Sequence, residues 1–412
     1  MRILLVADGR SPNTLHWLST LLTLSYQVRL VSSYPCSRPA GVQDFTVIPL
    51  AFGQVAGLGT PPVRAASPAL HRSTWIRRLI SQARPIFLTA RYILGPYAVR
   101  RQAQQFVRFI EADPPDLVHA LRIPFEGMLA TATPAGMLFV VSIWGNDLTL
   151  HAKGSPWMRA MTTRCLARAD ALIADAHRDI RLGHAWGFAA GRPTLVVPGS
   201  GGIDLAEINR PHPFTTGSVT GYLPAGVPLI VNPRGSRPGS VRNDVFFRAI
   251  PRVLRSHPEA IFLCPSLDRQ PEALRWIKRL NLQTHVRLMP QLPQDQLWNI
   301  FQHAQIFVSP SQHDGTPNSL LEAMACGCFP IVGDIESLRE WITPGVNGLL
   351  VDPTSPEALA EAILTALNSP ELRYRATAIN IALIKERAEV GPTRQAIDQF
   401  YHQVLARTQQ KA

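Results

Sequence analysis

The feature that most constrains this chain is the alternation of short runs rich in Val, Ile and Leu with longer segments of helical periodicity. Such runs predict buried strands at Arg2–Ala7, Val28–Ser33, Asp116–Ala120, Leu138–Trp144, Ala171–Asp175, Thr194–Pro198, Pro228–Arg234, Ala260–Pro265, Val286–Pro290, Ile306–Pro310 and Phe329–Gly333. Near-continuous apolar strands separated by helices are typical of parallel sheets with helices on both faces. The sequence therefore predicts an α/β, doubly wound fold.

The alternation breaks once, in a segment rich in Pro, Gly and Thr, and then restarts. A chain of 412 residues is long enough for two domains. We therefore expect a first Rossmann-like domain over 1–205, a linker over 206–227 and a second Rossmann-like domain over 228–377. The tail, 378–412, has a helical pattern and no strand to follow it.

The charge of the chain is strongly positive and unevenly placed. The net charge is +12, and no Asp or Glu occurs from Phe45 to Ile110. That stretch holds the arginines Arg64, Arg72, Arg77, Arg78, Arg84, Arg91, Arg100, Arg101 and Arg108. A surface of one sign attracts anions. The segment Thr74–Ile110 fits either an interfacial membrane helix or an amphipathic helix packed on its own domain. Nucleic acid is not expected as a partner, because no stacking motif or recognition helix is recognisable.

Other features favour a cytoplasmic protein without disulfides. No uncharged apolar run reaches the ~18 residues of a membrane span, and the apolar start is too short for a signal peptide. The five cysteines are odd in number and lack paired spacing, so neither a disulfide framework nor a zinc site is expected.

The segment Ile306–Val351 is the most informative part of the sequence for function. Its pattern predicts a strand, a polar loop, a helix and a second strand. Thr316 can cap the helix with Pro317 at its first position. The amides of Asn318, Ser319 and Leu320 would then bind phosphate at the helix start. Asp314 and Glu322 flank this start, and carboxylates suit the hydroxyl groups of sugar and ribose. Phosphate and polyol together indicate a nucleotide sugar.

This segment resembles the donor-site signature of glycosyltransferase family 4, the retaining GT-B enzymes. The family pattern is E-G-x-P-x-x-L-L-E-A-M-A-x-G, and here the run is Asp314-Gly315-Thr316-Pro317-Asn318-Ser319-Leu320-Leu321-Glu322-Ala323-Met324-Ala325-Cys326-Gly327. The first acid is Asp where the family has Glu, so its reach is one methylene shorter. The resemblance implies that Glu322 binds the ribose hydroxyls and that Asp314 and Gly315 belong to the donor site.

The resemblance extends to other positions. Arg234 follows a strand as the diphosphate-binding arginine of the family does, and Arg242 is our preferred substitute for a lysine that the family has and this chain lacks. In the first domain, Gly9 is similar to the glycine of the acceptor loop. Gly145 and Asp147 resemble the family's h-G-x-D segment. The tail helix is similar to one that crosses back onto the first domain.

Taken together, the resemblance implies a GT-B fold whose two domains face a cleft. It implies retaining transfer of a sugar from a nucleotide-sugar donor to a glycan, lipid-linked or other envelope-type acceptor. No DxD-like motif is present in a suitable loop, so we expect neither a metal nor another cofactor. With the Arg-rich stretch 64–108, the resemblance also predicts an anionic membrane surface as a partner, at the inner face of the plasma membrane.

Two alternatives share this fold. A nucleotide-sugar epimerase would need no acceptor and would isomerise the donor alone. A catalytically degenerate nucleotide-binding protein would be consistent with the Asp at position 314 and with the missing lysine.

Overall fold

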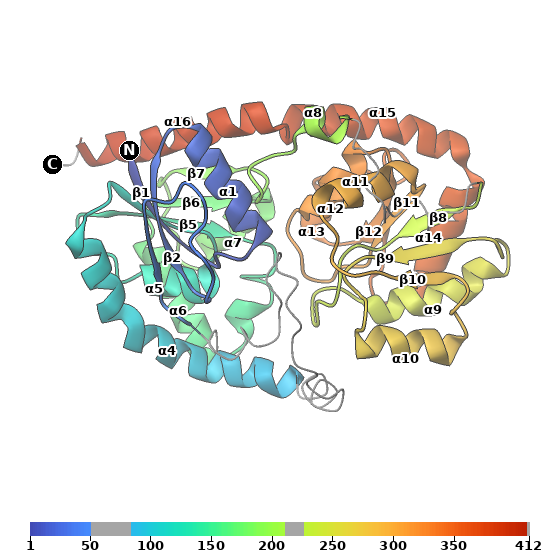
Figure 1. Cartoon of the computed structure of the whole chain (residues 1–412), viewed down its shortest axis with the longest axis horizontal. Coiled ribbons are helices and arrows are strands. Elements are labelled where there is room, and N and C mark those ends of the chain that lie inside the picture. Colours follow the sequence, from blue (N-terminus) through green and yellow to red (C-terminus); the bar gives the residue numbers. More distant parts are fainter. Residues whose placement is uncertain (51–83, 211–225, 410–412) are drawn as a thin grey trace. The chain divides into compact units, whose positions relative to one another are not determined.

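The chain divides into two compact units, which are described separately here. The computed structural model describes residues 1–50, 84–210 and 226–409 (Figure 1). Unit 1 comprises Met1–Gly201 together with Arg394–Ala412, and unit 2 comprises Gly202–Thr393. The helical tail is thus shared, since its last part belongs to the first unit.

Unit 1 is built on a seven-stranded parallel sheet with the strand order β3-β2-β1-β4-β5-β6-β7. Its strands are β1 (Arg2–Ala7), β2 (Gln27–Ser32), β3 (Asp44–Val47), β4 (Leu117–Ala120), β5 (Leu138–Ile143), β6 (Ala171–Ala174) and β7 (Thr194–Val196). The chain runs outward from β1 to β3 and then returns to β4 on the other side of β1. The order of a doubly wound sheet therefore reverses between β1 and β4.

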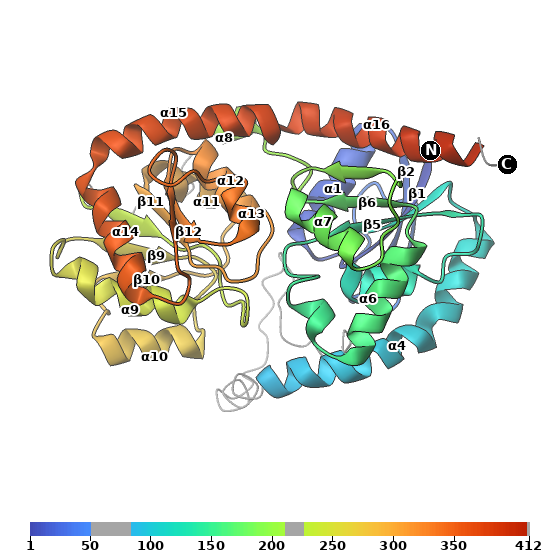
Figure 2. The same cartoon turned by 180° about the vertical axis from the view of Figure 1, so that it is seen from behind.

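Helices cover both faces of this sheet (Figures 1 and 2). On one face, Ile3 and Leu5 of β1 share a buried cluster with α1 (Pro12–Thr23) and α16 (Val390–Gln409). On the other face, Leu4 and Val6 share a cluster with α4 (Arg84–Ala112) and α6 (Pro156–Arg168). Successive strand residues point to opposite faces, which is why a continuous apolar strand can serve both layers. The remaining elements are η1 (Ile123–Gly127), α5 (Met128–Ala130), η2 (His151–Lys153) and α7 (His177–Ala185).

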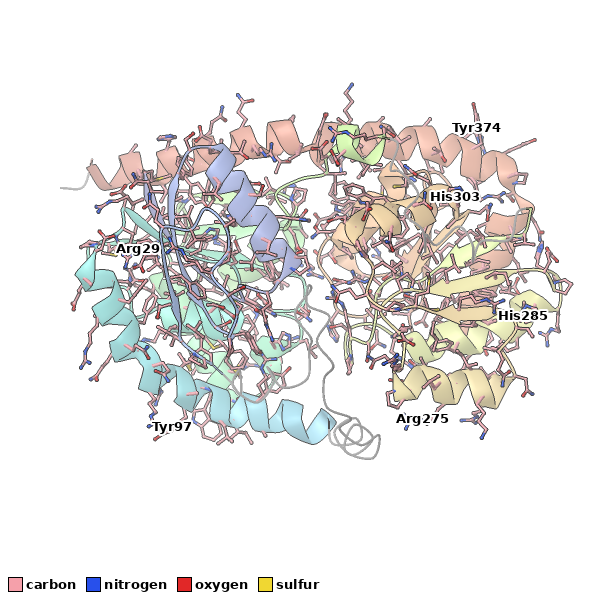
Figure 3. All side chains as sticks on the ribbon, viewed as in Figure 1. Arg29, Tyr97, Arg275, His285, His303 and Tyr374 are labelled. Atoms are coloured by element: carbon pink, nitrogen blue, oxygen red, sulfur yellow. The ribbon has the colours of Figure 1, made fainter. Side chains whose placement is uncertain are left out.

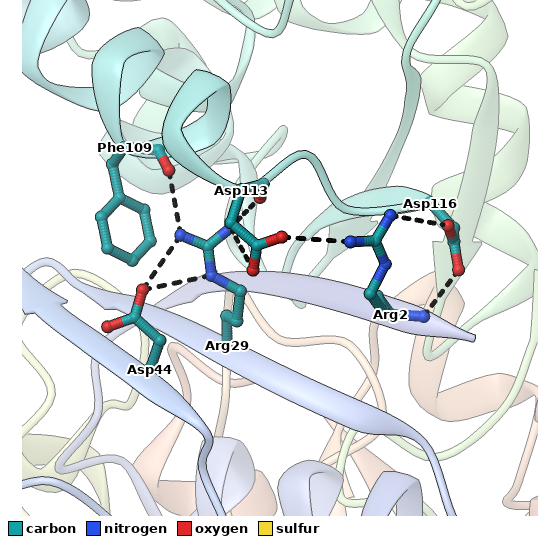
Figure 4. Close-up of polar contacts among 6 residues, drawn as sticks. All are labelled: Arg2, Arg29, Asp44, Phe109, Asp113 and Asp116. Atoms are coloured by element: carbon teal, nitrogen blue, oxygen red, sulfur yellow. Dashed lines mark hydrogen bonds and ion pairs between the residues drawn. The ribbon is translucent and has the colours of Figure 1, made fainter.

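At the amino edge of this sheet, a buried arginine ties strands to helix α4 (Figure 4). Arg29 of β2 is 3% exposed and pairs with Asp44 of β3 at 3.0 Å. Its guanidinium also donates to the carbonyl oxygen of Phe109 at 2.9 Å, near the end of α4. Asp113 joins Arg29 to Arg2 through a second ion pair. These contacts satisfy the last carbonyl groups of α4 and fix it against the sheet.

A polar network inside unit 1 anchors the last helix. His119 of β4 is fully buried, and its ring nitrogens lie 2.7 Å from the Tyr401 hydroxyl and 2.8 Å from Ser142 Oγ. Trp17 of α1 donates to the same Tyr401 hydroxyl at 3.2 Å. Burial lowers the pKa of His119 to about 3, so the ring is neutral and one nitrogen accepts a hydrogen bond. Helix α16 is therefore joined to α1, β4 and β5.

Unit 2 repeats the same plan with a six-stranded parallel sheet of order β10-β9-β8-β11-β12-β13. Its strands are β8 (Leu229–Val231), β9 (Ile261–Cys264), β10 (Val286–Leu288), β11 (Ile306–Ser309), β12 (Phe329–Gly333) and β13 (Leu349–Val351). The helices are α8 (Leu205–Ile208), α9 (Asn243–Leu254), α10 (Pro271–Leu280), α11 (Gln294–His303), α12 (Asn318–Ala325), α13 (Glu336–Arg339), α14 (Pro356–Asn368) and α15 (Pro370–Arg387). The predicted α/β fold of two parallel-sheet, Rossmann-like domains is confirmed.

The two ends of unit 2 are joined to each other. The amide of Ile203 donates to the carbonyl oxygen of Ala388 at 2.7 Å, and the amide of Val390 donates to the carbonyl oxygen of Ile203 at 3.0 Å. The segment that enters the unit and the segment that leaves it therefore pair as two short parallel pieces.

The predicted amphipathic segment Thr74–Ile110 is helical in its described part, α4. Residues 51–83, with Arg64, Arg72, Arg77 and Arg78, lie outside the described residues. Across the ranges that the structure describes, no helix combines the length and the apolar character needed to cross a bilayer.

Candidate functional site

The candidate site lies where the strand order of unit 2 reverses. β8 and β11 are neighbours in the sheet, with Ile230 opposite Ile306, although β9 and β10 lie between them in the sequence. Their carboxyl ends meet at one edge, and open α/β sheets bind ligands in the crevice at such a point. Arg234 follows β8 and Asp314 follows β11, so the topology brings these two predicted residues to one place.

Arg234 and Asp314 form a nearly buried ion pair. The Nη2 atom of Arg234 lies 2.5 Å from Oδ2 of Asp314, and the two side chains are 7% and 14% exposed. The Nη1 atom of the same guanidinium donates to Ser319 Oγ at 3.1 Å. Its Nε atom is buried and has no hydrogen-bond partner. Three of the predicted site residues thus meet, and the arginine keeps an unused donor.

The loop that carries Asp314 is held by contacts that the sequence pattern does not indicate. Ser311 Oγ donates to Asp314 Oδ2 at 3.0 Å, and Ser337 Oγ donates to the Asp314 carbonyl oxygen at 2.8 Å. Trp341 Nε1 donates to Thr316 Oγ1 at 2.9 Å. Ser337 and Trp341 come from the region after β12, so a neighbouring strand-to-helix connection fixes this loop.

Helix α12 begins one residue later than predicted. Its first residue is Asn318, and Pro317 occupies the N-cap position with φ −66° and ψ 125°. Thr316 therefore lies before the N-cap position, and its hydroxyl accepts the hydrogen bond from Trp341. The amide of Leu320 already donates to the Pro317 carbonyl oxygen at 2.9 Å.

The predicted phosphate-binding residues therefore differ in what they expose. The Leu320 side chain is in the core, and Gly315, Thr316 and Pro317 are buried within the loop. Asn318 and Ser319 are half-buried at the helix start. Ser319 offers both an amide and, through Arg234, a fixed hydroxyl group.

Glu322 is a buried carboxyl group one turn inside α12. It is 7% exposed, and Gln294 Nε2 of α11 donates to its Oε1 at 2.6 Å. Burial raises the pKa of Glu322 to about 8, although the nearby Trp298 and Gln294 side chains oppose this shift. A strongly perturbed acid beside a sheet edge is typical of functional sites. Its partner Gln294, 28 residues away in the chain, could not be predicted.

Arg242, the predicted substitute for a lysine, has an acidic partner of its own. Its Nε and Nη2 atoms donate to the two carboxylate oxygens of Asp244, each at 2.8 Å. Arg237, the other basic residue of this loop, is exposed and donates from Nε to the Arg234 carbonyl oxygen at 3.2 Å. Arg242 would have to share its charge with Asp244 to bind a phosphate.

Two asparagines that the sequence did not single out support Arg234. Asn232 Nδ2 donates to Asn243 Oδ1 at 3.1 Å, and Asn243 Nδ2 donates to the Gly235 carbonyl oxygen at 2.8 Å. Both asparagines are buried. They link the start of α9 to the turn around Arg234 and hold that turn at the sheet edge.

The predicted residues of unit 1 lie in loops that follow β1 and β5. The amide of Gly9 donates to Ser32 Oγ at 3.1 Å, and a Cβ atom at this position would lie 2.7 Å from Cys36 Sγ. Gly145 has a positive φ of 22° and accepts from Arg178 through its carbonyl oxygen at 2.8 Å. These glycines allow close approach of the backbone to its neighbours.

Asp147 is buried, and its contacts hold the loop after β5 in place. Its carboxylate is fully buried, pairs with Arg122 at 2.7 Å, and accepts from the amides of Ile123 and Trp144. With all these partners and no exposed surface, Asp147 holds the loops after β4 and β5 together. Contact between Asp147 and a substrate stays a prediction that would require this loop to open.

Comparison with known proteins identifies the second unit. A family model described as Glycosyl transferases group 1 matches residues 242–380. Residues 242–380 form a glycosyl transferases group 1 domain. This group 1 domain includes Asp314, Glu322 and the whole of α12, and Arg234 lies shortly before it. The buried acid and the helix start thus belong to a glycosyltransferase domain.

Relatives and solved structures extend the similarity. A D-inositol 3-phosphate glycosyltransferase of Thermobispora bispora is 28% identical over 58% of this chain and 57% of that protein. A GDP-mannose:cellobiosyl-diphosphopolyprenol alpha-mannosyltransferase of Xanthomonas campestris is 33% identical over 32% of this chain and 36% of that protein. This chain therefore matches about half of the first relative and about a third of the second.

The crystal structure of Anabaena HepE in complex with UDP matches over 98% of this chain and 100% of that chain. The TM-score is 0.70 and the sequence identity is 14%. At this identity the match shows the fold alone, which is that of two parallel-sheet, Rossmann-like domains.

Proposed function

We propose that this chain is a retaining glycosyltransferase of family 4 that takes its sugar from a nucleotide-sugar donor bound by unit 2. One observation carries the proposal: Glu322 lies one turn inside the helix of the group 1 domain whose start contacts Arg234 through Ser319, and Arg234 in turn pairs with Asp314. Cation, helix start and buried acid occur together at the switch point of the sheet, where ligands of such folds bind.

Each part of the donor has a matching group in this arrangement. Arg234, with its unused Nε, and the start of α12 suit the diphosphate, because guanidinium and helix N-terminal amides both favour negative charge. Glu322 suits the ribose hydroxyls, and Asp314 suits hydroxyls of the sugar. Negative charge that develops on the departing diphosphate would be stabilised by Arg234. No residue is proposed as a nucleophile.

The relatives suggest the classes of donor and acceptor. HepE was crystallised with UDP, and the name of the Xanthomonas enzyme specifies GDP-mannose and a diphosphopolyprenol acceptor. The Thermobispora enzyme is named for an inositol phosphate acceptor. We propose a hexose or related sugar as the transferred group and a glycan, lipid-linked or other envelope-type molecule as the acceptor.

Nucleotide binding tests the proposal first. A thermal-shift screen with UDP, GDP, ADP and their sugars should show at least one ligand that raises the melting temperature, since a ligand of the folded form alone stabilises it. No shift with any nucleotide would reject donor binding. A donor that shifts the melting temperature and is isomerised without an acceptor would favour an epimerase. Binding without turnover in any acceptor mixture would favour a degenerate nucleotide-binding protein.

Substitutions then test the site. Glu322→Ala and Arg234→Ala should each lower donor turnover by about 100-fold or more, because the first removes hydrogen bonds to the donor and the second removes a charged contact to it. Arg275→Ala is the control, since Arg275 is exposed on α10 (Figure 3) and takes no part in the site. Near-normal turnover in both site variants, with intact folding, would overturn the assignment.

We propose that transfer needs neither a metal nor another cofactor, since arginine and helix amides supply the positive charge toward the diphosphate. Turnover should then be unchanged by EDTA. Loss of turnover in EDTA, with recovery on adding Mg²⁺ or Mn²⁺, would show that a metal is required.

We also propose peripheral association with the inner face of the plasma membrane in a cytoplasmic protein. One face of α4 presents the exposed apolar side chains of Ile93, Leu94 and Tyr97, which are 48%, 51% and 69% exposed. Tyr97 points away from the unit 1 sheet (Figure 3). Arg100, Arg101 and Arg108 are exposed on the same helix. At 100° per residue these positions lie on one side of the helix, as in interfacial helices.

A further inference from the structure

Glu322 is held by a residue of the neighbouring helix. Gln294 is the first residue of α11, and its Nε2 atom donates to Glu322 Oε1 at 2.6 Å. α11 precedes β11 and α12 precedes β12, so the contact joins two successive helices of unit 2. It is made one turn inside α12, whose start contacts Arg234. Gln294 therefore reaches the candidate donor site from outside the segment 314–327.

Helix packing sets the position of Gln294. α11 and α12 lie side by side (Figures 1 and 2), and Phe301 of α11 shares a buried cluster with Leu320 and Met324 of α12. Such packing leaves the helices little freedom to slide past each other, because protein interiors are close-packed. The amide group of Gln294 is thus fixed relative to the carboxyl group that it contacts.

One side of α11 is directed at the buried acid. Trp298 is four positions after Gln294, so the two side chains leave α11 on the same side. Trp298 also lies near Glu322, and it opposes the effect of burial on the pKa of that carboxyl group. Gln296, two positions after Gln294, lies about 200° round the helix and belongs to another side. The chain therefore offers a second glutamine on the same helix for comparison.

Gln294 has hydrogen-bonding capacity that Glu322 does not use. A glutamine side chain has two N–H donors and a carbonyl acceptor. One N–H is taken by Glu322, and across the described parts of the chain this side chain makes no other hydrogen bond. Gln294 is half-buried, so part of it remains exposed. An amide oxygen and a second N–H are therefore left beside the carboxyl group.

The contact also affects which oxygen of Glu322 carries the acid proton. Burial raises the pKa of Glu322 to about 8, so the neutral acid is the main form at pH 7. Oε1 accepts from Gln294, which favours the proton on Oε2. The protonated oxygen donates a hydrogen bond, and the amide oxygen of Gln294 accepts one. Together the two side chains can serve two neighbouring hydroxyl groups.

We propose that Gln294 is a specificity-determining residue that holds Glu322 in place and, together with it, binds the two neighbouring hydroxyl groups of the ribose of a nucleotide. The proposal rests on the glycosyltransferase function proposed above and defines how its donor is recognised. A site built to hydrogen-bond a hydroxyl group rejects an analogue without it, because the polar groups of the site are left without partners. Gln294 therefore makes the site prefer ribonucleotides to deoxyribonucleotides.

Calorimetry with nucleotides that differ in one hydroxyl group tests the proposal. The probes are UDP, 2′-deoxy-UDP and 3′-deoxy-UDP, or the corresponding GDP or ADP series if the thermal-shift screen selects another base. The unmodified full chain should bind the ribonucleotide about tenfold or more tightly than at least one deoxy form. Equal binding of all three nucleotides would overturn the proposal.

Gln294→Met removes the amide group and keeps a side chain of similar length. It should weaken binding of the ribonucleotide about tenfold and leave binding of that deoxy form within about threefold, so that the preference for ribose is lost. Gln296→Met, on another side of α11, should keep the full preference. Equal weakening of the ribonucleotide and the deoxy forms in Gln294→Met would show a merely structural effect and would overturn the proposal.

Gln294→Asn is a second variant, which keeps the polar group on a side chain that is one methylene shorter. Because the shorter amide no longer reaches Glu322, the preference for ribose should narrow as it does in Gln294→Met. A preference that is unchanged in whichever of the two variants folds would contradict the role of Gln294.

A double-mutant cycle tests whether Gln294 acts together with Glu322. The cycle compares Gln294→Met, Glu322→Gln and the double variant. If the two side chains act as a pair, the double variant should lose about threefold or more less ribonucleotide affinity than the product of the two single losses. Losses that simply multiply would show that the two residues act independently.

Failure of this proposal can be separated from failure of the proposed function. If the unmodified chain binds no nucleotide, donor binding is rejected and this inference with it. If it binds a nucleotide without a preference for ribose, or with a preference that Gln294 does not affect, the result counts against Gln294 alone.

Discussion

The raised pKa of Glu322 determines which hydrogen bonds this buried side chain can make in unit 2. A carboxyl group of ordinary pKa would be ionised at neutral pH, but burial raises the pKa of Glu322 to about 8. The protonated acid can both donate and accept a hydrogen bond, whereas the carboxylate only accepts. Its hydrogen bond from Gln294 survives in either form, so the side chain stays in position as it titrates.

The pH dependence of stability should report this acid. The folded-state pKa of about 8 lies above the value of 4.5 expected when the chain is unfolded. The folded protein therefore holds the proton more tightly, and this contribution is full below pH 4.5 and is lost as pH rises through 8. Between pH 4.5 and 8, loss of this contribution lowers the free energy of unfolding by up to about 1.4 kcal/mol for each unit that the pH rises.

Urea unfolding at several pH values between 5 and 8 checks this contribution. Glu322→Gln keeps the shape of the side chain and cannot titrate, so its stability should vary less with pH than that of the unmodified chain. Parallel pH profiles for the two proteins would contradict the raised pKa.

Asp314 should contribute to stability through Arg234. Asp314→Asn leaves the nearly buried guanidinium without its carboxylate and should lower the free energy of unfolding by about 3 kcal/mol. Asp314→Glu keeps the charge and should cost less. Asp268→Asn is a suitable control, because Asp268 pairs with Arg269 at the surface, where such a pair contributes about 0–1 kcal/mol. Equal losses of unfolding free energy in Asp314→Asn and Asp268→Asn would show that the buried ion pair stabilises the fold no more than the surface pair does.

At residue level, the sequence predicted several of the residues that meet at the edge of the unit 2 sheet, but not what surrounds them. Asp314 and Ser319 were predicted from their places before and at a helix start, and Arg234 was predicted from the family resemblance; all three follow strands whose carboxyl ends converge at a sheet edge. The contacts of Ser337, Trp341 and Gln294 depend on how distant segments meet, which spacing does not encode. The burial of Asp147 was missed for the same reason, since its partner Arg122 is 25 residues earlier.

At the level of elements, long buried strands and amphipathic helices were the most predictable. The predicted strands Arg2–Ala7 and Phe329–Gly333 coincide with β1 and β12. Strands β3 and β13 were missed, because each is short, partly exposed and at the edge of its sheet. An edge strand of three or four residues has too few alternating positions for a pattern to be recognised.

Helix α16 should depend on its buried tyrosine. Tyr401→Phe would remove the hydroxyl that His119 and Trp17 share, and a buried polar group left without a partner costs about 1–3 kcal/mol. The free energy of unfolding of unit 1 should fall by about that amount, and amide hydrogen exchange in 394–407 should become faster. Tyr374→Phe is the matched control, because Tyr374 is 82% exposed on α15 (Figure 3). Equal behaviour of the two variants would contradict the anchoring role.

For the whole molecule, the excess of positive charge is the property with the widest effect. The net charge of +12 acts at a distance and should increase encounter with anionic surfaces at low ionic strength. The exposed arginines of α4 add a local patch to this general attraction.

Vesicle flotation checks this membrane interaction. The full chain should float with anionic vesicles and not with neutral ones, and added salt should weaken the association. Replacing Arg100, Arg101 and Arg108 with Gln should reduce binding, each arginine near the surface contributing about 1 kcal/mol. A triple replacement of the exposed arginines Arg255, Arg275 and Arg279 in unit 2 lowers the net charge equally and controls for overall charge. Equal flotation with anionic and neutral vesicles would contradict electrostatic binding of the chain to anionic membranes.

The pairing of Ile203 with the Ala388–Val390 segment has a consequence for how this protein can be taken apart or recombined. Because unit 2 enters and leaves through two segments that hydrogen-bond to each other, it is in effect an insertion whose two ends are already closed. Exchanging it for the corresponding part of a related enzyme would require two nearby junctions and would leave each sheet uncut. The ligand-binding properties of the two units could then be varied separately.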